Sequence, residues 1–323
     1  MLNAMQKARV GDDVFGEDPS VNELEARAAA MFGMEAALYS ISGTMSNQVA
    51  IKAHTQPGDE VICDFTSHVY QYEGGGIAFN SGASVQLLNG HLGKITATQV
   101  AAAINPDDVH KPHTSLVSLE NTANRGGGSC YEIQEIESIR RVCDENKLKL
   151  HLDGARLFNA IVAKNESPKA YGRLFHSISV CFNKGLGCPV GSILMGTKEY
   201  IRKARRIRKV FGGGMRQAGY MAATGLYALD HHIERLKEDH EHAKKIAGEL
   251  CQKKYIGEIL PVETNIIIFE VKGSKSAPEL INELKKENIL ALQMSPTQVR
   301  MVLHLDVTKE MVEIVKKTIK GIE

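Results

Sequence analysis

Short apolar runs that alternate with helical segments between residues 35 and 195 constrain the fold of this chain more than any other feature. Each run is rich in Val, Ile and Leu and is bounded by Gly, Pro, Asn or Asp, which is typical of buried strands. The predicted strands are residues 36–41, 60–63, 84–88, 115–119, 148–152, 177–182 and 191–195. Segments with helical patterns, such as residues 47–53, 96–103 and 133–146, fall between them. This alternation predicts an α/β fold with a mostly parallel central sheet and helices on both faces.

The pattern changes after residue 195. A basic helix is predicted over residues 198–209, followed by a long helical stretch over about 217–254. A smaller β-α-β-β-α pattern then occupies residues 265–322, which indicates a second, α+β unit. The length of 323 residues also agrees with two domains at ~150 residues each. We therefore expect a large domain over residues 1–253 and a small C-terminal domain over residues 254–323.

Composition and charge exclude several classes of partner. The 39 basic and 38 acidic residues leave a formal net charge of +1, which favours neither nucleic acid nor an anionic membrane. No apolar stretch approaches the ~18 residues of a membrane-spanning helix. The 6 cysteines form no Cys-x-x-Cys pair and the histidines show no metal-ligand spacing, so we expect reduced thiols, a cytoplasmic location and no metal site. The glycine clusters match neither the Rossmann fingerprint nor the P-loop.

Three predicted strands end in residues that carry chemistry. Asp153 follows one strand, Lys184 follows another, and the turn Ser42-Gly43-Thr44 leads from a third into a helix. Because ligands bind beyond the carboxyl ends of parallel strands, we expect these residues to share one crevice. A helix N-terminus with a glycine and a hydroxyl suits phosphate, a lysine can attach a carbonyl compound, and a carboxylate can keep a pyridine nitrogen protonated. Together these are the requirements of a pyridoxal-phosphate (PLP) enzyme.

Seven short segments in one order along the chain carry a family resemblance. They are VGDDVFGEDP at 10–19, SGTM at 42–45, SH at 67–68, ENT at 120–122, HLDGAR at 151–156, KGL at 184–186 and GGGMRQ at 212–217. With these segments the chain resembles, essentially end to end, the low-specificity L-threonine aldolases of the β-eliminating lyase group. The resemblance implies the aspartate-aminotransferase-like fold (fold type I) of PLP enzymes, with a large domain and a smaller C-terminal domain.

The resemblance implies roles around the cofactor ring. Lys184 would attach PLP covalently, and Asp153 would pair with the pyridine nitrogen. Arg156 would lie near the phenolic oxygen of the ring. His68 would stack on the ring face, where it would also influence proton transfer.

The resemblance also implies binding roles for the phosphate and the substrate. Ser42, Gly43 and Thr44 would bind the phosphate of the cofactor. Arg216 would reach a phosphate across a subunit interface, because the family builds its sites between subunits. Arg300 would hold the substrate carboxylate, a task that suits a planar guanidinium.

The implied reaction is retro-aldol cleavage of L-threonine or L-allo-threonine to glycine and acetaldehyde. The base that takes the β-hydroxyl proton stays open between His68 and an ordered water, with Glu73 nearby in the chain. Two alternatives remain: another PLP-dependent amino-acid lyase, aminotransferase or racemase, and a PLP-binding protein with impaired turnover. The resemblance further implies a homotetramer, a dimer of dimers, with small amino acids as its substrates.

Two departures from the family pattern concern the substrate. Related sequences begin with a Ser-Asp-Thr segment that contributes to carboxylate binding, and this chain starts after that position, so we expect a truncated N-terminal segment. Many relatives carry histidine where this chain has Ala123. Because that histidine contacts the threonine hydroxyl, we expect altered selectivity between the threonine diastereomers.

Overall fold

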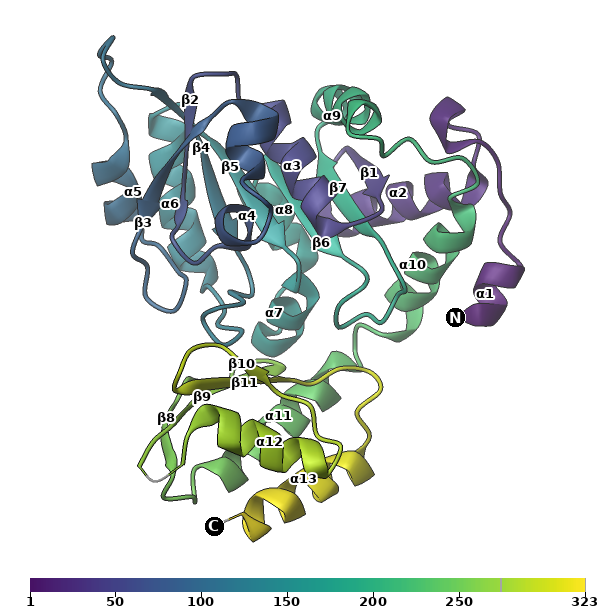
Figure 1. Ribbon diagram of the computed structural model, residues 1–323. Helices are drawn as coiled ribbons and strands as arrows, with labels where there is room; N and C mark the ends of the chain where they lie inside the picture. The colour runs from purple at the N-terminus through teal and green to yellow at the C-terminus, as the bar shows by residue number, and fades with distance from the viewer. Residues whose placement is uncertain (274, 323) are drawn as a thin grey trace.

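The computed structural model describes residues 1–273 and 275–322, and it divides the chain into a large α/β part and a smaller part that lies beneath it in Figure 1. The large part is built on a seven-stranded sheet, and the small part on a four-stranded antiparallel sheet. The α/β fold predicted from the sequence is therefore confirmed. Within the described residues, no helix combines the length and apolar character that a membrane span requires.

The large sheet has the strand order β1-β7-β6-β5-β4-β2-β3. Its strands are β1 (Ala36–Ser40), β2 (Asp59–Asp64), β3 (Ser84–Leu88), β4 (His113–Glu120), β5 (Lys149–Gly154), β6 (Ser177–Cys181) and β7 (Ser192–Gly196). Strand β7 is antiparallel to both neighbours, and every other pair is parallel. The carboxyl ends of β1, β2, β4, β5 and β6 therefore meet at one edge of the sheet, as the sequence predicts.

Helices cover both faces of this sheet. Up to residue 250, the helices are α1 (Leu2–Gln6), α2 (Pro19–Phe32), α3 (Gly43–His54), α4 (His68–Gln71), α5 (Ala97–Ala103), α6 (Ile133–Glu145), α7 (Leu157–Lys164), α8 (Pro168–Leu174), α9 (Lys198–Val210), α10 (Gly219–His231) and α11 (Leu236–Leu250). Of these, α1 packs against α10, and α11 packs mainly with the small sheet. Helices α3, α4 and α9 pack on one face, and α2, α5, α6, α7, α8 and α10 pack on the other. Successive strand residues alternate between the faces, so Leu194 of β7 packs toward α9 while its neighbours Ile193 and Met195 pack toward α2.

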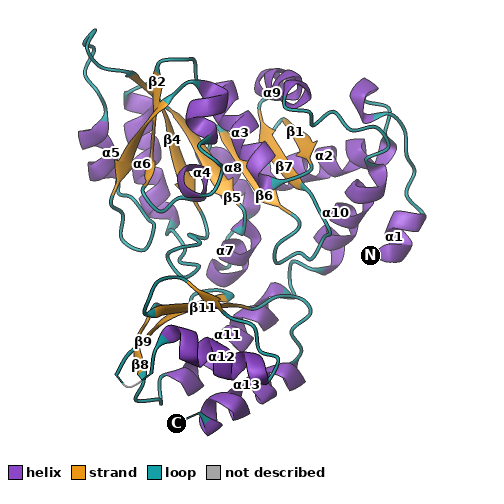
Figure 2. Cartoon of the chain, in the orientation of Figure 1, coloured by secondary structure: helices purple, strands orange, loops and turns teal. Residues whose placement is uncertain are grey.

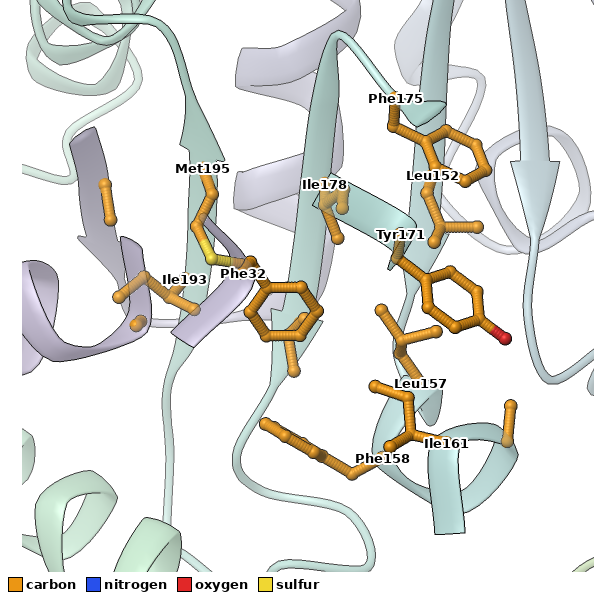
Figure 3. Packing of buried hydrophobic residues seen from close by; sticks show 14 of the residues in the cluster. Phe32, Leu152, Leu157, Phe158, Ile161, Tyr171, Phe175, Ile178, Ile193 and Met195 are labelled. Atoms are coloured by element: carbon orange, nitrogen blue, oxygen red, sulfur yellow. The ribbon is translucent and has the colours of Figure 1, made fainter. Parts of the chain in front are cut away.

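The largest core lies between the sheet and the α2 face. Phe32, Phe158 and Tyr171 come from three different helices and pack over Ile178 and Met195 of the strands (Figure 3). Local sequence sets the bounds of helix α2 in this core. The carboxylate of Asp18 accepts hydrogen bonds from the first-turn amides, Pro19 begins the helix, and Gly33 ends it with a φ of 67°.

The small part comprises β8 (Ile256–Ile259), β9 (Ile266–Val271), α12 (Ala277–Lys286), β10 (Leu292–Gln293), β11 (Gln298–Val302) and α13 (Lys309–Gly321). Its sheet lies between its helices and the large part (Figure 2). Strand β8 is absent from the sequence-based pattern, which begins at residue 265. The other elements of that pattern agree with the structure.

The single helical stretch predicted over residues 217–254 is wrong. It is two helices, α10 and α11, separated by a turn. The two helices separate because they pack in different cores. In α10, Ala222 and Ala228 pack in the main core. In α11, the apolar residues pack with the small sheet; they are Ala243, Ile246 and Leu250. An amphipathic pattern shows that a segment is helical but not that its direction changes. The domain boundary at residues 253 and 254 stays a prediction.

Candidate active site

The carboxyl edge of the large sheet brings the predicted site residues together from separate strands. Glu120 at the end of β4 pairs in register with Asp153 of β5. Lys184 lies three residues beyond the end of β6. The turn after β1 leads into helix α3, and the segment after β2 leads to His68 at the start of α4. The hydrogen bond between Asn47 of α3 and Asp153 of β5 connects segments 106 residues apart in the chain.

Lys184 and Arg156 line one cavity of about 360 Å³ at this edge. Its opposite wall comes from the small part, through Asn265 and the segment of residues 302–306. The cavity therefore lies where the two parts of the chain meet, which is a common position for a cofactor or substrate.

Asp153 is buried, with 2% of its surface exposed, and its two carboxylate oxygens accept different hydrogen bonds. Oδ1 accepts from the backbone N–H of Ala155 (3.1 Å), and Oδ2 accepts from the amide of Asn47 (2.9 Å). The same Asn47 amide donates to the buried carboxylate of Glu73 (2.9 Å). Burial, followed by the charge of Glu73, raises the pKa of Asp153. A positively charged partner for Asp153 would offset this cost, and a protonated pyridine nitrogen fits that requirement.

His68 contacts two carboxylates of the site, those of Glu73 and Glu120. Its Nδ1 lies 2.9 Å from Oε1 of Glu73, and its backbone N–H donates to Glu120 (2.7 Å). The hydrogen bond to Glu73 raises the pKa of His68, against the opposing effect of burial. Ligand atoms of His68, Glu73 and Asp153 lie within 4.8 Å of one another, a grouping of possible metal ligands that the sequence did not indicate. Because two of the three groups are carboxylates, the cluster also suits a nitrogen cation.

A cluster of arginines lies where the two parts of the chain meet. Asn124 Oδ1 accepts hydrogen bonds from Arg156 (3.1 Å) and from Arg300 of β11 (2.6 Å). Burial, followed by the charges of Arg156 and Arg125, lowers the pKa of Arg300 to about 10. The Nε atom of Arg300 is buried and has no hydrogen-bond partner among the described residues. This excess of positive charge and the free donor fit an anionic group such as a substrate carboxylate.

The N-terminus of helix α3 has the geometry of an anion site. Ser42 caps the helix and accepts a hydrogen bond from the backbone N–H of Met45 (3.2 Å), while the first amides, at Gly43 and Thr44, have no acceptor within the helix. A Cβ atom at Gly43 would lie 2.5 Å from Sγ of Cys181, so only glycine fits the approach of the helix to β6. These residues fit the phosphate of PLP.

Arg216 does not line the Lys184 cavity. Its guanidinium forms an ion pair with Asp12, and 62% of its side chain is exposed. The expectation that Arg216 reaches a phosphate across a subunit interface stays a prediction.

Three residues of the site have no role in the sequence-based prediction: Asn47, Glu120 and Asn124. Burial, followed by the charge of Asp153, raises the pKa of Glu120 to about 7, and its carboxylate accepts the backbone N–H groups of His68 and Asn124. Glu120 was visible only as part of the ENT segment. Asn47 and Asn124 are recognised only through partners that are remote in the chain.

Comparison with known proteins places the chain in a family. Residues 1–274 match the β-eliminating lyase family. The chain therefore belongs to the β-eliminating lyases, and the resemblance found in the sequence is confirmed.

Individual relatives narrow the comparison. The low-specificity L-threonine aldolase of Escherichia coli is 41% identical over 311 residues, which cover 96% of this chain and 91% of that protein. The corresponding protein of Saccharomyces cerevisiae is 37% identical over 325 residues, covering 99% of this chain and 82% of that protein. The structure of the threonine aldolase of Leishmania major superposes with a TM-score of 0.84 over 97% of this chain and 92% of that one, at 20% identity, and so shares the fold.

Proposed function

We propose that this protein is a PLP-dependent aldolase that cleaves L-threonine and L-allo-threonine to glycine and acetaldehyde. The observation that carries the proposal is the meeting of Lys184, buried Asp153 and the arginine pair Arg156 and Arg300 at one edge of the sheet. Relatives that match nearly the whole chain are low-specificity L-threonine aldolases. When bound, PLP supplies the electron sink that stabilises a carbanion at the substrate Cα.

Residues of the chain itself bind the substrate, hold the cofactor ring and accept the substrate proton. Arg300 binds the substrate carboxylate with its free Nε and thereby fixes the orientation of the bond between Cα and Cβ. Asp153, held by Asn47, would pair with the pyridine nitrogen of bound PLP and keep it protonated. His68 accepts the proton of the β-hydroxyl, directly or through an ordered water, and Glu73 holds its ring in place.

The proposal extends to selectivity, assembly and location. Ala123 is buried and carries no polar side chain, so nothing at that position distinguishes the two orientations of the β-hydroxyl. We therefore propose that both threonine diastereomers are substrates. The protein is proposed to act in the cytoplasm as a homotetramer with sites at its subunit interfaces, in keeping with the family resemblance.

Absorption spectroscopy with a coupled assay tests the proposal. The purified protein loaded with PLP is expected to show a visible band that borohydride removes, and to release acetaldehyde from both diastereomers, measured with alcohol dehydrogenase. Lys184→Ala should abolish the band and the activity. Lys285→Ala, a change at a lysine of α12 in the small part, serves as the control and should retain both.

Other outcomes identify the alternatives. Release of pyruvate, transfer of the amino group or racemisation without acetaldehyde would show a different PLP reaction. A visible band with no turnover of any amino acid would show a PLP-binding protein. A protein that forms no band would contradict the site assignment itself.

A further inference from the structure

A second cavity, of about 800 Å³, lies at the opposite edge of the large sheet. It is lined at the ends of the strands by Lys149 and His176, and by His54 at the last turn of helix α3. A series of hydrogen bonds runs from His54 through the interior to Asp153. This series crosses the sheet from one edge to the other, and the proposed reaction uses only its inner end.

Four contacts make up the series. Nε2 of His54 lies 2.8 Å from Oγ of Ser177, and that hydroxyl lies 2.8 Å from Nδ1 of His151. Nε2 of His151 lies 3.4 Å from Oδ1 of Asn47, the longest of the contacts. The amide nitrogen of Asn47 then donates to Asp153 at 2.9 Å. Both Ser177 and His151 are fully buried, so no solvent competes for these bonds.

The donor and acceptor roles of these side chains give all the hydrogen bonds of the series the same direction, from His54 toward Asp153. The amide nitrogen of Asn47 faces two carboxylates, Glu73 and Asp153, so its Oδ1 faces the opposite way, where it accepts from Ser179 Oγ (2.6 Å) and lies 3.4 Å from Nε2 of His151. Because that oxygen only accepts, its contact with His151 requires the proton of the ring on Nε2. A neutral His151 then accepts at Nδ1 from the Ser177 hydroxyl. Since Ser177 has a single hydrogen, it must in turn accept from Nε2 of His54.

The histidines are neutral in this arrangement. Burial lowers the pKa of His151 to about 3. Burial, followed by the neighbouring imidazoles of His151 and His176, also lowers the pKa of His54 well below its ordinary value, with Lys149 and Lys203 acting in the same direction. Each group therefore has one donor and one acceptor in the series, and every donor points toward Asp153. Aligned hydrogen bonds strengthen one another and stabilise the negative charge at their end.

We infer that His54, Ser177, His151 and Asn47 are positioning residues that hold Asp153 in place and stabilise its ionised form. The inference rests on the proposed function, in which Asp153 pairs with the cofactor nitrogen. No proton moves along the series; it acts through fixed dipoles.

Substitutions at Ser177 test the inference in the PLP-loaded protein. Ser177→Ala removes the donor to His151, and we expect PLP to dissociate about 3- to 10-fold more readily, as for the loss of one hydrogen bond. The visible band should shift, and kcat for threonine should fall with KM unchanged. Ser177→Thr keeps the hydroxyl and should restore all three properties.

Ser192→Ala is the matched control. Ser192 is also fully buried on a strand of the same sheet, but its hydroxyl donates to the backbone of Val180, outside the series. It should leave PLP affinity and the visible band unchanged. Equal effects of Ser177→Ala and Ser177→Thr, or equal effects of Ser177→Ala and Ser192→Ala, would overturn the inference.

A second measurement uses the protein without PLP. In the ¹⁵N spectrum of labelled histidine, His151 should be neutral with its proton on Nε2. A proton on Nδ1 would contradict the direction of the series. This measurement needs neither cofactor nor activity, and therefore remains decisive for a variant that binds no PLP.

Chemical rescue tests the outer end of the series. His54→Ala opens a space that faces the 800 Å³ cavity, so added imidazole should enter and restore the PLP affinity that this change removes. His151→Ala leaves a space with no opening to that cavity, and imidazole should not restore it. Unchanged PLP affinity in His54→Ala would exclude His54 from the series.

The tests separate the two proposals. If the protein shows the PLP band but releases no acetaldehyde, the proposed aldolase function fails while the affinities of the Ser177 variants still test the series. If acetaldehyde is released and Ser177→Ala changes neither band nor affinity, the function stands and the inference is overturned.

Discussion

The hydrogen bond between His68 and Glu73 controls the pH at which the imidazole becomes neutral. The carboxylate of Glu73 is fully buried, and the proton on Nδ1 of His68 is stabilised by its contact at 2.9 Å. The pKa of His68 is therefore raised above the ordinary 6.5. Only the neutral ring can accept the substrate proton, so activity should increase as the pH rises through this raised pKa.

Removing the charge of Glu73 should move this transition. Glu73→Gln is expected to lower the pKa of His68 and shift the rising limb of the kcat profile to lower pH by about one unit, the size of effect usual for a nearby opposite charge. Asp108→Asn, which disrupts the exposed contact with His110 at 2.8 Å, is the control and should leave the profile in place. An unshifted limb in Glu73→Gln would exclude His68 as the base.

The free donor of Arg300 makes a prediction for substrate binding. Arg300→Ala should raise KM for threonine by about 10- to 100-fold, the usual effect of losing a charged hydrogen bond, while the PLP band is retained. The KM of Arg300→Lys should lie between the values for the wild type and Arg300→Ala, because lysine keeps the charge without the planar geometry. Arg141→Ala on α6 is the control. KM is measured by steady-state kinetics. If Arg300→Ala lost PLP while KM for threonine stayed unchanged, the assignment of Arg300 to the substrate carboxylate would be contradicted.

At the scale of elements, helix α3 connects several functions of the site. Its N-terminus carries Gly43 and Thr44 at the proposed phosphate site, Asn47 one turn later holds Asp153, and His54 at its last turn lines the opposite cavity. The helix packs against β6 closely enough that a Cβ at Gly43 would overlap Sγ of Cys181. The position of α3 relative to β6 therefore determines the geometry of the proposed phosphate site.

A pair of substitutions tests this packing. Gly43→Ala should displace the helix N-terminus and weaken PLP binding by about 1–3 kcal/mol, the range for an overpacked contact. Cys181→Ala removes the sulfur 2.5 Å from the new methyl group, so the double variant should recover most of the affinity. PLP titration followed by absorbance measures both, with Cys181→Ala alone as reference. A double variant as weak as Gly43→Ala would mean that the clash is elsewhere.

At the scale of the whole molecule, the site depends on both parts of the chain. Arg300 belongs to the small sheet, yet it shares the oxygen of Asn124 with Arg156 of the large part. Thr264 Oγ1 also donates to the backbone of Gly128 across the same boundary (2.8 Å). Arg216, by contrast, does not line the Lys184 cavity, and its exposed guanidinium pairs with Asp12. We propose, from the family resemblance, that a neighbouring subunit supplies Arg216 to the site.

Hybrid oligomers test the shared site. Lys184→Ala and Arg216→Ala should each be nearly inactive alone. When the two are co-expressed, mixed dimers contain one site with both residues intact, and about a quarter of the wild-type activity should return. Light scattering of the wild-type protein should give about four times the chain mass of 35.4 kDa. Hybrids without activity would contradict the role of Arg216 across the interface.

Local patterns account for what was predicted correctly. The seven strands of the large sheet lie within two residues of the predicted runs, because a buried strand needs a short apolar segment with turn residues at its ends. The assignment of Asp153 and Lys184 to the site rests on the same kind of pattern, because they follow such strands, and it stays a prediction. The break between α10 and α11 and the strand β8 were not predicted, since both depend on which core a segment joins.

The sequence by itself determined the α/β order of elements, the family and the edge of the sheet that carries the candidate site, because apolar periodicity and short motifs are local properties. Only the tertiary structure decided which groups set the charges at that edge. Asn47 and Asp153 are 106 residues apart, and Asn124 and Arg300 are 176 residues apart. Hydrogen bonds between such groups depend on chain packing, and in a buried site they determine which carboxylates, imidazoles and guanidinium groups face the substrate.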